Sequence, residues 1–486
     1  MSRQPRGLAI LFLTEMGERF SYYGIRAILI LFLVAPDHQG GLGIGDRSAA
    51  AVLGLYLAGT YLFSLPGGWV ADRLTGPRRA VIIGGAIIAL GDLLLVSDSR
   101  RVFFLGLLLN VIGVGLLKPN ISVLVATLYP EGGARRDAGF AIFYMGINSG
   151  SFLGALLIPW VAASAGWHWG FVCTALGMLL ALLRFLKSPV GACSSPTAKV
   201  SWPQVAAASS MLLLGIVLVS AGGLPFEAMA VANATSWLIA ALALGYFIYL
   251  TAFARISDLE RRRLYVMMAL FCASALFWAG VEQMGTTFSL FASRYTERRF
   301  FGLEIPAGMF LSANPIFVIL FSPVFAALWL RLGSRGRDCS PPAKFAVGLA
   351  LMGCGFLPMV LASRYVLMGE KVSAAWLLFT YLLHTCGELC VSPVGLSSMT
   401  RLAPARHIGQ VMGMWFLAVA LGNNLAGQLS GLYDAHDLDS LPSLYGKLFW
   451  GGLICSGVLA LLTPKLKQLM ECDPVPQNAR ENFIKQ

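Results

Sequence analysis

Long apolar segments recur along almost the whole chain, and short polar loops separate them. A helix needs about 20 apolar residues to cross the hydrocarbon core of a bilayer. The pattern therefore predicts fourteen membrane-spanning helices, near residues 8–34, 48–71, 79–97, 101–128, 138–163, 167–187, 204–222, 228–253, 264–292, 307–331, 344–363, 373–400, 408–430 and 444–464. An even number of spans places both termini on one side of the membrane.

Composition supports this interpretation. Of the 486 residues, 57% are hydrophobic and only 12% are charged, and the mean hydropathy is +0.72. An ordinary soluble protein is far more polar. The 9 cysteines lie in or beside apolar runs, without the clustered spacing of a disulfide framework or a zinc ribbon. We therefore expect an all-α polytopic protein of the lipid bilayer.

The positive charges orient the predicted spans. Of the 36 lysines and arginines, 24 fall in the termini and loops of one side, 9 on the other side, and 3 within spans. Positive residues accumulate in cytoplasmic loops, so both termini are expected in the cytoplasm. The basic residues are scattered over loops between spans, so the net charge of +12 does not indicate nucleic-acid binding.

The spans group into three parts. The least hydrophobic linker, residues 187–203, follows the sixth span, and the run Arg261–Arg263 precedes the ninth. The seventh and eighth spans contain almost no polar residue that could contact a substrate. We therefore expect an N-terminal six-helix bundle (1–187), a linker with two inserted helices (188–260), and a C-terminal six-helix bundle with a cytoplasmic tail (261–486).

The first span carries four charges in the stretch "TEMGERFSYYGIRAIL", residues 14–29. At ~100° per residue its polar side chains fall within an arc of about 100°, with Tyr23 at the margin. Such a stripe can be a structural ion network or a functional site, and an ionisable group within a membrane is a functional candidate by default. The stripe consists of Glu15, Glu18, Arg19, Tyr22 and Arg26.

Polar residues in other spans add candidates from both halves of the chain. Several stand beside a proline, which removes a backbone donor and favours a kink or cavity. The candidates are Lys118, Tyr144, Asn148, Trp278, Glu282, Asn314, His384, Glu388, Ser392 and Trp415. Asp92 also lies within a span, and snorkelling or an interhelical hydrogen bond explains it better than proton transfer does.

Two resemblances follow from these residues. The loop "GGWVADRLTGPRR" (67–79), centred on Asp72 and Arg73, resembles the Gly-x-x-x-Asp-Arg-x-x-Gly-Arg-Arg loop of the major facilitator superfamily. That resemblance implies two six-helix bundles around a central site. Six further stretches on six helices are similar, in order, to motifs of the proton-dependent oligopeptide transporter family: "EMGERFSYYG", "KPNIS", "DAGFAIFYMGINSG", "FWAGVEQ", "NPIF" and "GELCVSPVGLS". "GTTFSL" and "VATLY" depart mildly from the family pattern. The short loop at 364–372 is similar to that of bacterial members.

The resemblance implies a proton-coupled symporter that imports di- and tripeptides by alternating access between the two bundles. It further implies a cell-membrane protein of bacteria that works as a monomer, is driven by the proton gradient and needs no cofactor. Arg26 and Lys118 would hold the peptide carboxylate, because cationic donors bind carboxylates strongly. The full predicted substrate site is Tyr22, Tyr23, Arg26, Tyr61, Lys118, Tyr144, Asn148, Trp278, Glu282, Asn314, Glu388, Ser392 and Trp415. In it Glu388, Asn148 and Asn314 would hold the ammonium group, and the aromatic rings would line tolerant side-chain pockets.

Proton coupling is assigned to Glu15, Glu18, Arg19 and Glu282, since neighbouring carboxylates titrate as a coupled set. We further expect two gating pairs. Arg26 with Glu282 would close the outer side, and Lys118 with Glu388 would help to close the inner side.

Other functions remain as alternatives. A related transporter of nitrate, an amino acid or a conjugated metabolite would be expected to lack the Glu-x-x-Glu-Arg signature, which is complete here. A membrane hydrolase would need a nucleophile with an adjacent base, and neither a Gly-x-Ser-x-Gly elbow nor a His-Glu-x-x-His pair is present. His384, Cys386, Glu388 and Cys390 do not share one helix face, so no metal site is expected. The sequence contains no Gly-Lys-Ser/Thr phosphate-binding loop, which argues against ATP as the energy source.

Overall fold

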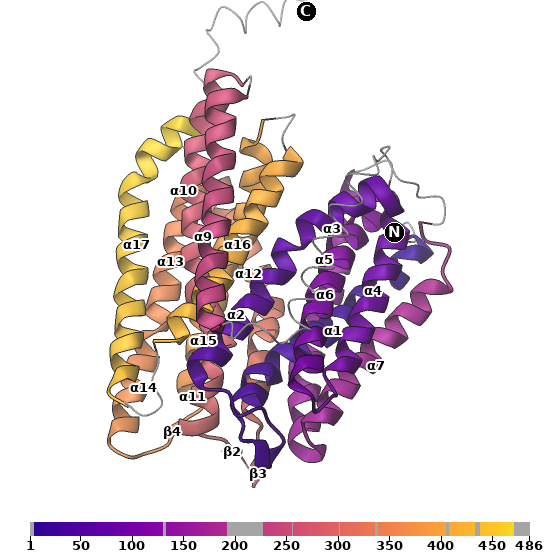
Figure 1. The fold of residues 1–486 in the computed structure, drawn as a ribbon. Helices are drawn as coiled ribbons and strands as arrows, with labels where there is room; N and C mark the ends of the chain where they lie inside the picture. The colour runs from indigo at the N-terminus through magenta and orange to yellow at the C-terminus, as the bar shows by residue number, and fades with distance from the viewer. Residues whose placement is uncertain are drawn as a thin grey trace, which may run out of the picture.

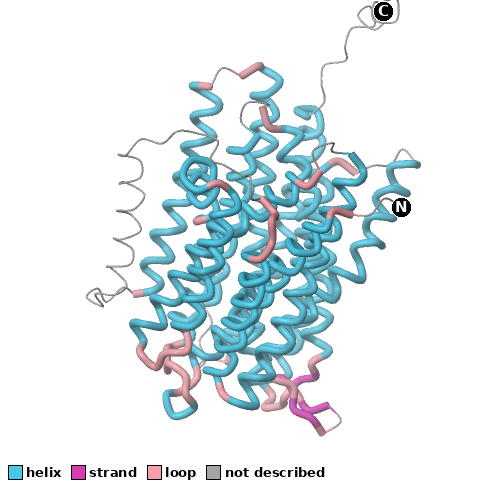
Figure 2. The backbone as a smooth tube through the Cα atoms, turned by 90° about the vertical axis from the view of Figure 1, so that its right-hand side faces the viewer, coloured by secondary structure: helices cyan, strands magenta, loops and turns pink. Residues whose placement is uncertain are grey.

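A computed structural model describes residues 4–129, 133–191, 227–254, 256–300, 302–335, 339–404, 408–432 and 438–470. The described chain is almost entirely helical. Two helical bundles stand side by side in Figure 1. Figure 2 shows the helices running in roughly one direction, with the short strands at the end of the molecule opposite the chain termini.

The N-terminal bundle contains the first six predicted spans. Its elements are α1 (Arg6–Val34), η1 (Asp37–Gln39), α2 (Asp46–Leu62), α3 (Ser64–Val70), the π-turn η2 (Ala71–Thr75), α4 (Pro77–Leu94), α5 (Arg100–Thr127), α6 (Gly133–Ala165) and α7 (Trp167–Leu186). Gly76 adopts a positive φ of 76°. Glycine tolerates that conformation, and Pro77 then begins α4 at the position where proline suits a helix. The motif at 67–79, expected as a loop, thus covers the end of α3, all of η2 and the start of α4, and the chain turns at Gly76.

The C-terminal bundle contains the last six. Its helices are α10 (Asp258–Val281), η4 (Glu282–Met284), α11 (Thr287–Tyr295), η5 (Ala307–Ser312), α12 (Ala313–Ser334), α13 (Pro341–Gly355), α14 (Leu357–Leu367), α15 (Ala375–Leu402), α16 (Ile408–Ser430) and α17 (Ser440–Met470). A capping box of Ser257 and Glu260 begins α10. Strand β1 (Thr296–Glu297) pairs in parallel with β4 (Val372–Ser373), and β2 (Arg299–Phe300) pairs antiparallel with β3 (Leu303–Glu304).

One inserted helix, α9 (Ala228–Ile248) with the π-turn η3 (Tyr249–Phe253), packs against α2 of the first bundle and α16 of the second. Asn424 and Gln428 of α16 donate hydrogen bonds of 2.6 and 3.0 Å to the carbonyl oxygen of Ala232. The predicted seventh span, 204–222, lies outside the described residues.

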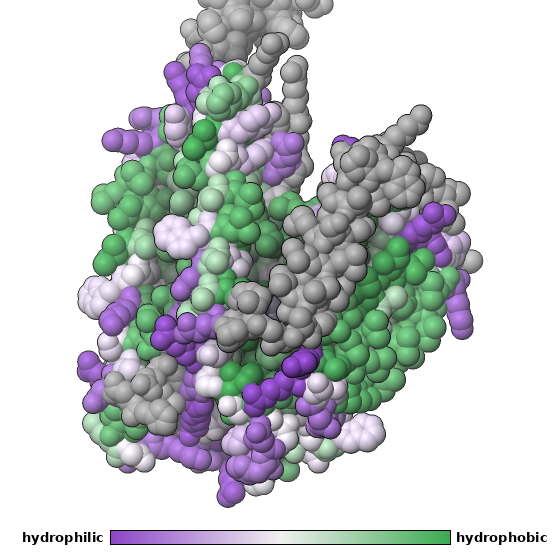
Figure 3. All heavy atoms as spheres, in the orientation of Figure 1, coloured by the Kyte–Doolittle hydropathy of each residue, from purple (hydrophilic) through white to green (hydrophobic). Residues whose placement is uncertain are grey.

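The other thirteen predicted spans each overlap a described helix, and ten helical segments are long and apolar enough to cross a membrane. Segment α1, with its five charged residues, is not one of the ten. The count of fourteen is therefore not confirmed. Apolar side chains cover much of the middle of the visible N-terminal bundle, and hydrophilic ones gather towards its ends (Figure 3).

Several predicted spans are broken helices, which sequence periodicity did not predict. The span near 48–71, for example, breaks at Phe63 between α2 and α3. The span near 344–363 breaks at Phe356, where Pro358 removes a backbone donor. The span near 264–292 breaks after Glu282, and Thr286 has non-helical backbone angles. A side chain at Gly285 would begin 3.3 Å from Nε of Arg26, so glycine lets that guanidinium approach the break.

The two bundles meet at the end opposite the termini and diverge towards the other end (Figure 1). A Cβ atom on Gly54 of α2 would lie only 3.0 Å from Cα of Gly427 of α16. On the same side, Gly308 of η5 approaches the carbonyl oxygen of Ala27 in α1. Small residues thus allow close backbone contact between the bundles at this end.

Candidate functional site

The polar stripe predicted for the first span lies on α1 and forms a buried charged cluster, which we call the α1 stripe. It consists of Glu15, Glu18, Arg19, Tyr22 and Arg26. Nε of Arg19 lies 2.9 Å from Glu15 and 2.8 Å from Glu18. Within the part of the chain that the structure describes, Oε2 of Glu15, both oxygens of Glu18 and Nη2 of Arg19 have no hydrogen-bond partner. One guanidinium therefore faces two carboxylates, and these carboxylates have oxygen atoms that are free to bind a proton.

Arg26 and Glu282 form an ion pair between the bundles. Nη2 of Arg26 lies 2.6 Å from Oε2 of Glu282, and both side chains are buried. The guanidinium also stands 5.5 Å from the ring centroid of Tyr23. The predicted pairing is confirmed, and it joins α1 to the first residue of η4. Its role in gating stays a prediction.

Lys118 and Glu388 do not pair in this conformation. Nζ of Lys118 lies 3.7 Å from the ring centroid of Tyr61, and no carboxylate oxygen of the described residues is within 4.0 Å of it. Glu388 instead accepts a hydrogen bond of 2.9 Å from Asn314, which also donates one of 3.0 Å to Thr385. The predicted contact of Asn314 with Glu388 is present. We attribute the missing ion pair to the separation of the two bundles, which diverge towards the end that holds the chain termini (Figure 1).

The remaining predicted residues differ in accessibility. Tyr144 is 50% exposed, whereas Asn148 is buried and donates to the Tyr144 carbonyl oxygen. Trp415 is only 4% exposed and packs edge-on against Phe345. Oγ of Ser392 and Nε1 of Trp278 are buried atoms without a hydrogen-bond partner in the described chain. Tyr22 is buried and stacks with Tyr56.

Sequence reasoning missed a second ion pair between the bundles. Arg294, in the last turn of α11, forms bonds of 2.5 and 2.7 Å to the two carboxylate oxygens of Asp46, in the first turn of α2. These residues flank loops, where hydropathy gives no signal. Thr385, one turn before Glu388, was also missed because an uncharged hydroxyl in a span is not distinctive.

Two other predictions can be compared with the geometry. Asp92 has no exposed surface, so it does not snorkel, and the alternative interhelical hydrogen bond is present. No group of three or more potential metal ligands occurs among the described residues. His384 contacts the Met352 carbonyl oxygen at 3.0 Å.

Comparisons with known proteins identify the family of this chain. The POT family model matches residues 78–448. The chain belongs to the POT family. It is 43% identical to the peptide transporter YePEPT of Yersinia enterocolitica over 96% of this chain and 95% of that one. It is 34% identical to the di-/tripeptide transporter of Lactococcus lactis subsp. lactis, over 96% and 97% of the two chains. The crystal structure of the peptide transporter POT in complex with sulfate superposes with a TM-score of 0.89 at 34% identity, over 96% of each chain.

The POT family match includes Lys118, Glu282 and Glu388 but begins after α1. The relatives align over nearly the full length of the chain. The solved POT structure shares the major facilitator fold with this chain, so the two-bundle architecture and the membership of a multi-pass transporter family are both established.

Proposed function

We propose that this POT-family chain is a proton-coupled symporter that imports di- and tripeptides by alternating access. The observation that carries the proposal is the Arg26–Glu282 ion pair, which joins the two bundles across a buried contact only 2.6 Å long. The names of the relatives, a peptide transporter and a di-/tripeptide transporter, support the substrate class. No cofactor is needed, because a proton gradient supplies the driving force.

Substrate binding follows from the charges that the two bundles present. The zwitterionic backbone of a peptide has a carboxylate and an ammonium group. Lys118 of the first bundle would bind the carboxylate, and Arg26 would join it when released from Glu282. Glu388 of the second bundle, with Asn148 and Asn314, would bind the ammonium group. The site would thus recognise the two charged ends of the peptide, and the aromatic residues around it would accept varied side chains.

Alternating access follows from the ion pairs. The ion pairs Arg26–Glu282 and Asp46–Arg294, both present in this conformation, would close the outer side. Lys118 and Glu388 would approach each other when the inner side closes. Protons bound at Glu15, Glu18 and Glu282 would weaken the pairing with Arg19 and Arg26, so that the proton gradient drives the exchange. We place both termini in the cytoplasm of a bacterium and the protein, as a monomer, in its inner membrane. The bundles would be residues 1–187 and 261–486, with the inserted helices in 188–260.

Transport into liposomes tests the proposal. The protein is reconstituted, an acidic exterior and an inside-negative potential are imposed, and labelled dialanine is followed. We expect uptake above empty vesicles that dialanine and trialanine inhibit and that a protonophore abolishes. Uptake that nitrate or a free amino acid inhibits, but dipeptides do not, would favour the alternative transporter of another solute. No uptake of any of these compounds would refute the proposal.

A further inference from the structure

A carboxyl group inside the N-terminal bundle takes no part in the site described above. Asp92 of α4 is completely buried. Its Oδ2 accepts a hydrogen bond of 2.6 Å from Ser21 of α1, and its Oδ1 accepts one of 2.6 Å from Asn110 of α5. Both donors are neutral, and no lysine or arginine nitrogen of the described chain lies within 4.0 Å of it. Buried carboxylates are normally paired with a cation, so Asp92 needs another explanation.

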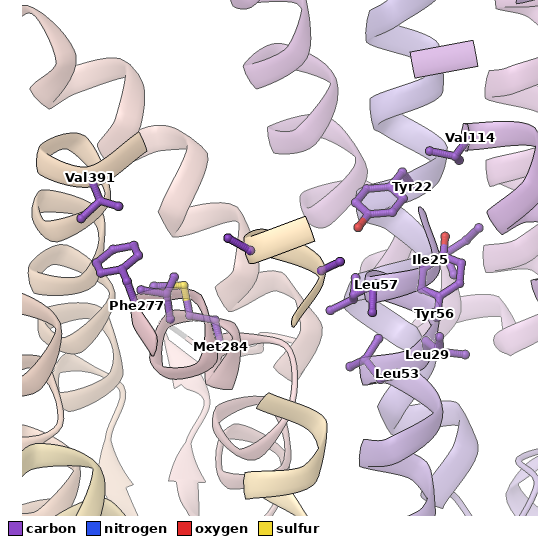
Figure 4. Close-up of a cluster of buried hydrophobic side chains, with 14 of the residues drawn as sticks. Tyr22, Ile25, Leu29, Leu53, Tyr56, Leu57, Val114, Phe277, Met284 and Val391 are labelled. Carbon is purple, nitrogen blue, oxygen red and sulfur yellow. The ribbon is translucent and has the colours of Figure 1, made fainter. Parts of the chain in front are cut away.

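A chain of contacts leads from Asp92 to the α1 stripe. The amide oxygen of Asn110 accepts a hydrogen bond of 2.9 Å from the Tyr56 hydroxyl. The ring of Tyr56 stacks on that of Tyr22, with centroids 5.8 Å apart and planes 25° apart. Figure 4 shows these two rings beside each other within the N-terminal bundle. The Arg19 guanidinium in turn lies 5.5 Å from the Tyr22 centroid.

The order of donors and acceptors in this series of hydrogen bonds depends on the charge of Asp92. Tyr56 donates to Asn110, and Asn110 and Ser21 donate to Asp92, as an acceptor-only carboxylate requires. A proton on Oδ1, the oxygen that faces Asn110, would turn that oxygen into a donor. Asn110 would then present its amide oxygen to Asp92, which leaves the Tyr56 hydroxyl without its acceptor.

The ionisable groups around Asp92 couple it to the proposed proton site. Glu18 of α1 interacts with Asp92 electrostatically, and Tyr56 is the titratable group that α2 contributes. On α5 the facing group is the neutral amide of Asn110. The α7 helix carries His168 and Arg184 in its end turns and the thiol of Cys173 between them. Two carboxylates repel each other, so we expect the protonation of Asp92 to depend on that of Glu18.

We propose that Asp92 is a proton-responsive positioning residue, whose protonation reorients Asn110 and Tyr56 and thereby shifts Tyr22 within the α1 stripe. The inference rests on the proposed proton-coupled transport. Asp92 does not touch the substrate. The only covalent change is an O–H bond formed with a proton from the aqueous phase and broken when that proton leaves.

The test uses the full chain in liposomes with three variants. Asp92→Asn keeps the shape of the side chain but cannot titrate. Tyr56→Phe removes the hydrogen bond from Tyr56 to Asn110 and leaves the hydrogen bonds of Asp92 intact. This variant therefore still tests the proposal if Asp92→Asn folds poorly. Thr174→Val is the control, because among the described residues this buried α7 hydroxyl bonds only to a carbonyl oxygen of its own helix. Each variant is assayed for counterflow of labelled dialanine without a gradient, and for gradient-driven uptake between external pH of about 5 and 8.

We expect counterflow to stay within about twofold of wild type in all three proteins, because none of them replaces a residue that is proposed to contact the peptide. The pH dependence of driven uptake should flatten in Asp92→Asn and Tyr56→Phe, with a loss of about fivefold at the acidic optimum, and stay unchanged in Thr174→Val. A wild-type pH profile in Asp92→Asn would overturn the inference. So would an equal loss of counterflow and driven uptake at every pH, because that indicates a purely structural role. Failure of the transport proposal itself would appear in the wild-type protein.

Discussion

The Arg26–Glu282 pair is the contact whose loss should be easiest to detect. Glu282→Gln removes the negative charge but keeps the shape of the side chain and one acceptor for Arg26. Both side chains are shielded from solvent in the structure. In the variant, the closed conformation therefore buries the Arg26 guanidinium without an opposing charge. Breaking a buried ion pair in this way typically costs about 3 kcal/mol.

That free energy changes the balance between conformations substantially. A loss of about 3 kcal/mol shifts an equilibrium by a factor of about 150. The second pair, Asp46–Arg294, remains in place, so the outer side is expected to open partly. If the wild-type protein favours the closed conformation by a similar free energy, the variant should populate both conformations about equally.

Distances between spin labels measure this balance. Labels at His38 and Leu303 report on opposite bundles at the closed end, where both side chains are exposed. Wild type should give a short-distance peak, and Glu282→Gln should add a longer one. The control Glu297→Gln removes the same charge from an exposed position at that end and should leave the distances unchanged.

A second variant separates gating from misfolding. Replacing both partners, with Arg26→Met and Glu282→Leu, leaves no unpaired charge and should restore the short distance, although peptide transport stays lost. An unchanged distance distribution in Glu282→Gln, together with uptake like that of the wild type, would refute the assignment of this pair as a gate.

Three further predictions follow. Glu18→Gln should abolish gradient-driven accumulation of peptide but keep counterflow, because a proton-binding group is lost while the substrate site is intact; accumulation against a gradient would contradict the assignment. Lys118→Gln should raise the KM for dialanine about tenfold, since one charge-assisted contact is lost, whereas Lys118→Arg should largely preserve it; equal KM values in the Gln variant and wild type would exclude Lys118 from carboxylate binding. His384→Ala should destabilise the protein by about 2–4 kcal/mol, because it leaves the Met352 carbonyl unpaired and a cavity beside Phe356; a melting temperature equal to that of wild type in detergent would show that this contact is not structural.

Local sequence pattern predicted the helices and much of the site. A membrane requires every backbone group to bond within its own helix, so apolar length alone locates spans. Helical periodicity then placed Glu15, Glu18 and Arg19 on one face, and the structure brings all three into contact. Motif resemblance added the partner of Arg26, which no periodicity could supply because 256 residues separate the two side chains.

Tertiary structure alone decided the rest. The break near Glu282 lies where Arg26 of α1 forms its ion pair, and the cluster around Asp92 requires α1, α2, α4 and α5 to meet at one level. The ion pair Asp46–Arg294 joins loop-flanking residues that hydropathy does not distinguish. Lys118 and Glu388 show the limit most clearly, since both lie where the sequence predicted and yet remain apart. Their separation depends on how one bundle is tilted against the other, and the sequence of either helix does not encode that tilt.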